Sequence, residues 1–591
     1  MFSRRITTGL VIAAVAICAA GAATSEGADH ALSVYPSAGT PAASPQSQIS
    51  FRGAGPVELG TVRVTGSRTG DHTGRLQSHS DGNGASFIPA RPFSPGETVT
   101  VRTDRPLVGA NHGAVAFTVA NAPSPKLAKA AGSGGSTAGD GASGGGSAFH
   151  TIAGFNPPSI QVLTRKKGRA KGDIFLAPKS GQRAAMIIDD SGRLVWYHPA
   201  PHGFRIYDTR RQKYRGRNVL TWIEWRDCRT PDCGIARIYD NTYSQIDSVR
   251  AGNGYAADFH DFTLSPQGTA YLLVQQPVQA DLRSVHGPRN GTVYDSIVQE
   301  IDIPTGSVRF EWHALGHVPL KESGVRYSSH GIYDPYHVNS VDQEKNGNLL
   351  ISTRNTNSVY EVDKGSGNIL WRLGGKKSTY KMGHGAAFIA QHDVRRQRDG
   401  TITIFDNGSG AGLGNRASRA IVLKLSGHNA RLVHDMRRPQ AVHAASQGSV
   451  EMLPTGGYFV GWGGQVPYFS EFDKNGHLVY DARFANTVGN TYRAFRYSWH
   501  ARPGDLPAVA ASASNGKTHV WMSWNGATEV AKWQVFAGML PQVIQSVKTV
   551  GRRDFETGTS FKGVQRFVQV KALDSHGNVL GTSAMAAVAG T

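Results

Sequence analysis

The sequence predicts an all-β protein: a six-bladed β-propeller flanked by an N-terminal Ig-like and a C-terminal fibronectin III/Ig-like β-sandwich. Three observations predict it: three strand-like segments that begin at a histidine, repeated strand–turn–strand units, and short alternating strands near both ends. At 591 residues the chain is too long for one hydrophobic core, so several domains are expected.

The histidine segments recur at similar spacing. His260 and His392 each precede a turn glycine by 8 residues, whereas His337 precedes Gly347 by 10 because its turn is longer. Repeated units that each deliver an imidazole to the same end are typical of a repeat fold with a central site.

A second pattern, an apolar strand, a turn with Asp or Gly and another strand, occurs in six copies, at residues 186–196, 238–246, 299–310, 360–371, 422–433 and 470–480. A further hairpin precedes five of them, and two hairpins make the four antiparallel strands of a propeller blade. The first copy lacks its hairpin, so we expect the segment near Thr491 to complete that blade. The propeller is predicted over residues 149–500.

The flanking regions have different compositions. Residues 30–121 and 501–591 alternate apolar and polar residues between turns, which predicts the two sandwiches. Residues 122–148 are dominated by Gly, Ala and Ser and are predicted to be a flexible linker.

Residues 1–23 are typical of a secretory signal peptide: an arginine pair, a short apolar run and small residues. We therefore expect a secreted or cell-surface protein with no integral membrane segment after signal removal, since no other apolar run reaches spanning length. Lipidation at Cys18 and twin-arginine export are weaker alternatives.

After export two cysteines remain, Cys228 and Cys233, and an oxidising compartment favours a disulfide between them. The formal net charge of +20 favours anionic partners. Its basic residues are scattered without a binding motif, so nucleic acid is not an expected partner.

Strand pairing predicts which residues join the histidines. Arg354 ends the strand that follows Gly347, so antiparallel pairing returns it beside His337. Asn339 points to the same face as His337. The full predicted cluster comprises His260, His337, Asn339, Arg354 and His392 at one mouth of the propeller, with Asn407 behind His392 and Ser449 at the equivalent place in the next blade.

Each residue has a plainer interpretation. A single blade-edge histidine is more often a structural hydrogen bonder, and Arg354 alone could pair with a surface carboxylate. Asp261 and Asp393 resemble orienting partners, but adjacent strand residues face opposite sides. Three imidazoles are a known zinc set, although Arg354 favours an anion over a metal. His, Arg and Asn together suit a tetrahedral oxyanion, and a neutral histidine can act as a nucleophile.

Several motifs resemble the propeller of bacterial aryl-sulfate sulfotransferases, in the divergent exported branch of that family. They are HisAspPhe at His260, TyrHisValAsnSer at His337, LeuLeuIleSerThrArg to Arg354, IleLeuTrpArgLeuGlyGly from Ile369, GlnHisAsp at His392 and IlePheAspAsn to Asn407.

The resemblance implies a six-bladed enzyme that moves a sulfuryl group from a phenolic sulfate to an acceptor phenol through a sulfohistidine, without a nucleotide sulfate donor. It implies no cofactor and no metal, and small-molecule partners: an aryl sulfate donor and a phenolic acceptor. His392 would be the nucleophile, and His260, His337, Asn339 and Arg354 would hold the sulfate. Two alternatives remain: a non-catalytic extracellular propeller that binds anionic or sulfated ligands, and a metal-dependent lyase or hydrolase.

Overall fold

The structure is a computed structural model that describes residues 31–121, 149–179, 181–410, 412–485 and 489–590. Strands dominate it, so the all-β prediction is confirmed. The predicted signal peptide and linker lie outside the described residues. No helix in the described part of the chain is long and apolar enough to cross a membrane.

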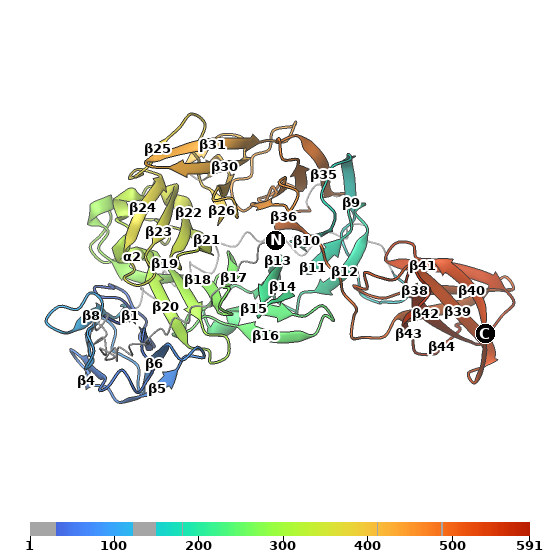
Figure 1. Cartoon of the computed structure of the whole chain (residues 1–591), viewed down its shortest axis with the longest axis horizontal. Coiled ribbons are helices and arrows are strands. Elements are labelled where there is room, and N and C mark those ends of the chain that lie inside the picture. The colour runs from blue at the N-terminus through green and yellow to red at the C-terminus, as the bar shows by residue number, and fades with distance from the viewer. Residues whose placement is uncertain (1–30, 122–148, 180, 411, 486–488, 591) are drawn as a thin grey trace, which may run out of the picture.

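The described residues between 149 and 497 form six sheets of four or five strands, antiparallel except where β25 pairs with β31, and Figure 1 shows them around a common centre. Sheets 1 to 3 are, in pairing order, β12 (Leu194–Pro199), β11 (Ala184–Ile188), β10 (Asp173–Pro178) and β36 (Thr491–Tyr497); β13 (Arg205–Tyr214), β14 (Arg217–Trp225), β15 (Gly234–Tyr239) and β16 (Gln245–Val249); and β17 (Phe262–Leu264), β18 (Ala270–Ala280), β19 (Gly291–Ile301) and β20 (Val308–His313).

Sheets 4 to 6 follow the same plan. They are β21 (Val338–Gln343), β22 (Leu349–Thr353), β23 (Ser358–Val362) and β24 (Ile369–Gly374); β26 (His392–Arg396), β27 (Ile402–Asp406), β30 (Arg419–Ser426), β31 (Asn429–Met436) and β25 (Lys381–Met382); and β32 (Ser449–Met452), β33 (Tyr458–Gly461), β34 (Tyr468–Phe472), β35 (Leu478–Phe484) and β9 (Ile160–Arg165).

Short elements occupy the connections. They are the hairpin β28 (Ser409–Gly410) and β29 (Gly414–Asn415), α2 (Ala314–His317), and the 3-10 turns η2 (Pro231–Cys233), η3 (Arg283–Val285), η4 (Leu320–Glu322) and η5 (Arg354–Thr356).

The ring is closed by strands from distant parts of the chain. β36 pairs with β10, Phe175 opposite Phe495, so the segment near Thr491 completes the first sheet as predicted. At the other edge β9 pairs with β35. The N-terminal part of the ring thus receives a strand from the C-terminal part, and the reverse also holds. Backbone hydrogen bonds of both strand pairs close the ring.

Two smaller sheet pairs flank the ring. Before it are β1 (Ser33–Tyr35), β2 (Ile49–Arg52), β5 (Gly74–Ser78) and β6 (Gly84–Pro89) against β3 (Arg63–Gly66), β4 (Gly70–Asp71), β7 (Thr98–Arg102) and β8 (Val115–Thr118), around a common core. After it are β37 (Ala508–Ser514), β38 (Lys517–Ser523) and β41 (Glu556–Lys562) against β39 (Lys532–Leu540), β40 (Val543–Gly551), β42 (Phe567–Leu573), β43 (Val579–Thr582) and β44 (Ala586–Ala587), around Trp533.

The N-terminal sheets dock on sheet 3 through charge. Arg309 pairs with Asp81 at 2.9 Å, and Asp302 accepts hydrogen bonds from Ser80.

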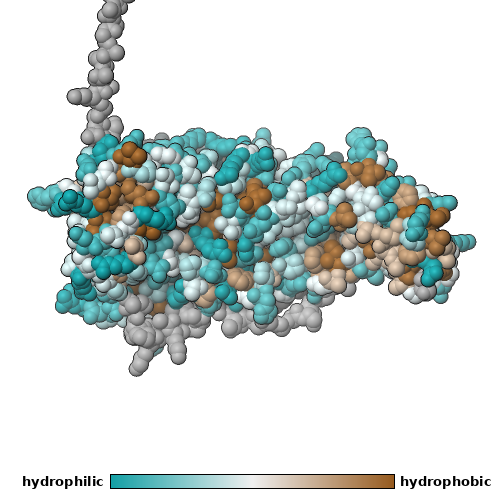
Figure 2. All heavy atoms as spheres, turned by 90° about the horizontal axis from the view of Figure 1, so that it is seen from below, coloured by the Kyte–Doolittle hydropathy of each residue, from teal (hydrophilic) through white to brown (hydrophobic). Residues whose placement is uncertain are grey.

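The surface is mainly hydrophilic, with hydrophobic patches visible at both ends of the molecule (Figure 2). The C-terminal sheets contribute exposed Met539, Leu540 and Val543.

A network of buried charges fills the centre of the ring. Arg493, on the closing strand β36, pairs with Asp208 at 3.0 Å and with Asp261 at 2.8 Å. Arg210 and Arg395 also reach Asp261. Burial alone would raise the pKa of Asp261, but Arg395, Arg493 and Arg210 together hold it below its ordinary value. These ion pairs join sheets 1, 2, 3 and 5.

Arg493→Met should destabilise the ring by roughly 3–5 kcal/mol, because it leaves buried carboxylates without their shared cation. Urea unfolding followed by tryptophan fluorescence measures the loss. Arg437→Met is the matched control: that side chain is 51% exposed in its pair with Asp435, and its loss should cost only about 0–1 kcal/mol. Equal effects of the two substitutions would contradict a central role for Arg493.

Candidate functional site

His392 is fully buried at the first position of β26. Its Nδ1 lies 2.8 Å from Oδ1 of Asn407 and 3.1 Å from the carbonyl of Ala390. Within the described residues its Nε2 is buried and has no hydrogen-bond partner. One ring nitrogen is therefore anchored and the other is available.

Asn407 fixes the tautomer of that imidazole. Its Nδ2 donates to the carbonyls of Ala444, at 2.7 Å, and Gln447, at 3.0 Å. The amide oxygen must therefore face His392, where it accepts the proton of Nδ1. Burial lowers the pKa of His392 well below its ordinary value, and the charges of Arg354, His260 and His337 lower it further. The imidazole is neutral near pH 7, with its lone pair on Nε2.

His260 and His337 face each other through Nε2 atoms 3.2 Å apart. Each Nδ1 is engaged by a carboxylate: Asp258 at 2.8 Å from His260, and Asp334 at 2.5 Å from His337. Both Nδ1 atoms are then donors, so a hydrogen bond between the rings requires a proton on one Nε2. The 3.2 Å contact between the rings can therefore hold one proton between the two Nε2 atoms.

Arg354 and Asn339 complete the cluster. The backbone of Arg354 donates to the carbonyl of His337 at 3.1 Å, which confirms that strand pairing brings these residues together. Its guanidinium is anchored on Asn355 and on the carbonyl of Ala445. Asn339 donates to the carbonyl of Gln391, directly before His392.

Four site residues carry buried polar atoms that lack a hydrogen-bond partner in the described part of the chain: Nε2 of His392, Oδ1 of Asn339, Nε of Arg354 and Oδ1 of Asp334. Buried polar groups are normally satisfied, so these atoms mark a candidate place for a polar ligand, with Nε of Arg354 as a donor and the other three atoms as acceptors. No group of three or more His, Cys, Asp or Glu side chains in the described ranges is arranged to hold a metal ion.

Ser449 and the aspartates that follow two of the histidines have other partners in the structure. The hydroxyl of Ser449 exchanges hydrogen bonds with the backbone of Ala494 on β36, so it contributes to ring closure. Asp261 and Asp393 do not orient the neighbouring histidines, because both carboxylates turn inward to the arginines of the central network.

The sequence reasoning missed the two carboxylates that do orient the histidines. Asp258 lies two residues before His260 and Asp334 three residues before His337. An acid shortly upstream of both histidines was the available signal. The reasoning considered only the residue after each histidine.

The fold and site define an all-β protein with a cluster of three histidines and an arginine in a ring of sheets. A family model described as arylsulfotransferase (ASST) matches residues 223–485, which contain every predicted site residue. The match supports the arylsulfotransferase family for this segment of the chain. No curated protein matches the chain.

Several solved structures resemble the chain at low identity. A protein of unknown function from Bacteroides caccae is 14% identical, with a TM-score of 0.35, over 55% of this chain and 98% of its own. Virginiamycin B lyase from Staphylococcus aureus, in a catalytically inactive form with quinupristin, is 9% identical, with a TM-score of 0.29, over 63% and 97%. A putative 6-phosphogluconolactonase from Bacteroides fragilis is 9% identical, with a TM-score of 0.30, over 66% and 99%.

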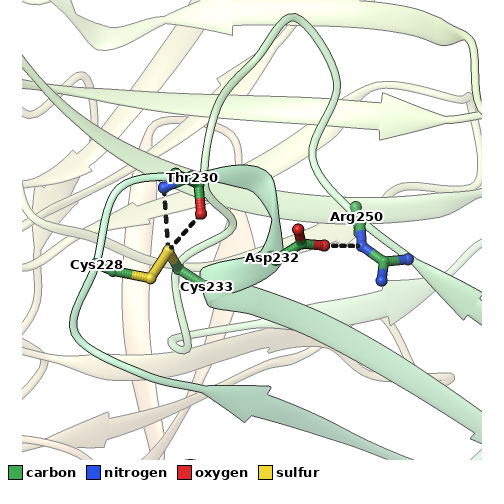
Figure 3. The surroundings of a disulfide bond; sticks show 5 residues. All are labelled: Cys228, Thr230, Asp232, Cys233 and Arg250. Carbon is green, nitrogen blue, oxygen red and sulfur yellow. Dashed lines mark hydrogen bonds and ion pairs between the residues drawn. A yellow bond between two sulfur atoms is a disulfide. The ribbon is translucent and has the colours of Figure 1, made fainter.

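The predicted disulfide joins Cys228 and Cys233 in the loop between β14 and β15, with Cα atoms 5.4 Å apart (Figure 3). Thr230 donates its backbone N–H to Sγ of Cys233 at 3.0 Å, and Asp232 pairs with Arg250 at 3.0 Å. The loop follows Trp225, whose ring lies 5.1 Å from that of Phe259, next to His260.

Replacing both cysteines by serine should lower the free energy of unfolding by ~2 kcal/mol, as expected for opening so short a loop. Urea unfolding with and without a reductant measures the effect. Reductant should shift the midpoint of the native protein and leave that of the double variant in place. Identical midpoints for all four samples would show that the loop is held by its other contacts.

Proposed function

We propose that the protein is an aryl-sulfate sulfotransferase that moves a sulfuryl group from a phenolic sulfate to an acceptor phenol through a sulfohistidine, without a nucleotide donor. The observation that carries the proposal is the free Nε2 of His392, buried and unprotonated among cations. A neutral imidazole held in one tautomer is a nucleophile for an electrophilic sulfur.

The proposal includes the molecular setting. The six sheets would be the blades of a propeller over residues 149–500, and the flanking sheet pairs would be an Ig-like domain and a fibronectin III/Ig-like domain. The protein would be exported by its signal peptide and would meet its substrates outside the cytoplasm.

In the first half-reaction, Nε2 of His392 attacks sulfur and the bond from sulfur to the phenolic oxygen breaks. The electron pair leaves with that oxygen, which takes the proton shared by His260 and His337. Arg354 holds the sulfuryl oxygens with its charged fork, and Asn339 offers the second hydrogen of Nδ2, which its bond to the Gln391 carbonyl does not use. Positive charge that develops on the His392 ring is stabilised at Nδ1 by the carbonyl of Asn407.

In the second half-reaction an acceptor phenol returns its proton to the histidine pair as its oxygen attacks sulfur. The sulfur–nitrogen bond breaks and its electron pair returns to Nε2. Asp258 and Asp334 keep both imidazoles oriented throughout, since each carboxylate holds an Nδ1 proton. Every proton and electron pair is restored at the end of the cycle.

His392→Asn should abolish turnover of a chromogenic aryl sulfate while donor binding persists, because Arg354 and the other histidines still hold the anion. Chromophore release with and without added phenol measures turnover, and isothermal titration measures binding. His477→Asn, at a side chain 76% exposed, is the control and should behave like the native protein.

Intact-mass analysis of native protein quenched with donor alone should show a sulfuryl adduct on the His392 peptide. An adduct on His260 or His337 would reassign the nucleophile. Rapid turnover without any adduct would replace the covalent route by direct transfer. Binding of aryl sulfates without release, for native protein and variant alike, would favour the non-catalytic binding propeller.

Asn407→Leu should lower kcat on the order of 10²-fold or more, because Nδ1 loses the acceptor that fixes the tautomer. KM for the donor should change little, since Asn407 faces the far side of the ring. Initial rates over a range of donor concentrations separate the two constants. Asn368→Leu, at an exposed turn, is the matched control. Unchanged turnover in Asn407→Leu would show that the Ala390 carbonyl suffices to hold the tautomer.

A further inference from the structure

The proposed reaction uses residues from only one side of the mouth of the ring. The opposite side carries two cations with no role in that reaction. His260, His337, Arg354 and His392 belong to sheets 3, 4 and 5 and the turns before them. Sheets 6, 1 and 2 complete the circle, and there Lys179 follows β10 directly while Arg205 begins β13. Both lie outside the segment matched by the family model.

Lys179 is connected to the nucleophile by hydrogen bonds. Its Nζ donates to Oε1 of Gln447 at 2.6 Å, and the carbonyl of Gln447 accepts from Asn407, which holds His392. Lys179 therefore lies at the same end of the ring as His392, and the two are linked through Gln447 and Asn407.

The charge of this opposite side is not balanced by the protein. Burial lowers the pKa of Lys179 to about 8, with the charge of Arg205 adding to the effect. Among the described residues no ion pair joins Lys179 or Arg205 to a carboxylate. Both residues are half-buried, and two neighbouring cations that lack a counter-ion favour an anionic ligand that supplies the missing charge.

An aromatic wall leads from these cations to the reacting centre. Arg205 pairs with Trp225 at one end of β13 and β14, two residues from Tyr207. The ring of Phe259 stacks at 4.5 Å on Tyr207 and at 4.3 Å on His260. Phe259 and Trp225 are half-buried, so part of each ring remains available to a ligand. Tyr207 and His260 cover the faces of Phe259, so a flat aromatic ligand would meet the edge of this ring and the exposed part of Trp225.

We propose that Lys179 and Arg205 bind a second anionic group on the aromatic substrate, whose ring lies along Phe259, Tyr207 and Trp225 while its sulfated or acceptor oxygen faces His392. The preferred substrates are therefore phenols that also carry a carboxylate or a similar anion. The inference rests on the proposed sulfuryl transfer and narrows its substrate class.

The test compares matched substrates on the full-length protein. Donors are 4-nitrophenyl sulfate and its ring-carboxylated counterpart, each with phenol as acceptor. Acceptors are phenol and hydroxybenzoate, each with 4-nitrophenyl sulfate as donor. The native protein should have kcat/KM roughly tenfold or more higher for a carboxylated substrate, the size expected of one charge-assisted contact. The two arms show whether the anion is carried by the donor, the acceptor or both.

Lys179→Met and Arg205→Gln should each bring the ratio of kcat/KM between carboxylated and neutral substrates toward one, and Lys179→Arg should keep it high. The ratio cancels any displacement of Gln447 and Asn407, since both substrates use the same His392. Lys424→Met removes an exposed lysine from β30 and should leave the ratio unchanged. The inference would be overturned if the native protein had a kcat/KM ratio near one, or if the ratio stayed high in Lys179→Met and Arg205→Gln. Sulfuryl transfer itself would still stand in both cases.

If no aryl sulfate is turned over, the proposed function fails and binding decides the inference separately. Calorimetric titration with hydroxybenzoate should then show binding that Lys179→Met weakens roughly tenfold and Lys424→Met does not. Equal binding of hydroxybenzoate and phenol to the native protein would overturn it.

Discussion

The buried arginine on the closing strand is the interaction on which the rest of the ring depends. Arg493 has no solvent exposure, and it is shared by Asp208, Asp261 and Asp393 at 3.0, 2.8 and 3.6 Å. Ions in the interior lose several kcal/mol of hydration each, so the arrangement is stable only while every charge keeps its partners. Because those partners lie on sheets 2, 3 and 5, the network requires β36 to be in place, and ring closure and charge pairing occur together.

The same strand supports the site. Tyr492 donates its hydroxyl to the carbonyl of His260 at 3.1 Å, and Arg493 donates to the carbonyl of Asn339 at 3.1 Å. Ala494 engages Ser449. Three successive residues of β36 therefore form hydrogen bonds to three of the predicted site residues, His260, Asn339 and Ser449. A reaction that needs fixed distances between groups from different sheets gains from a common anchor of this kind.

Regular strand geometry explains how much of this could be predicted. The completion of the first sheet near Thr491, the return of Arg354 to His337 and the pairing of His392 with Asn407 all follow from alternation and antiparallel pairing. The roles of the acids do not follow. His337 and Asp393 adopt left-handed backbone angles, with φ of 56° and 50°, and side chains at such positions leave the simple alternation of a strand. Asp258 and Asp334 lie in the irregular turns before the strands, where no period applies.

The electrostatics of the site assign two tasks to the same cations. Burial lowers the pKa of His392, and the charge of Arg354 together with the two neighbouring histidines lowers it further, which keeps the lone pair of Nε2 available before substrate arrives. In the proposed reaction a sulfate ester would bring negative charge to these residues, and the repulsion that lowers the pKa of His392 would then be offset. The ring nitrogen becomes able to carry positive charge at the moment that it bonds to sulfur. Charge that is already in place stabilises the transition state more than the ground state. This difference is what lowers the barrier of a reaction.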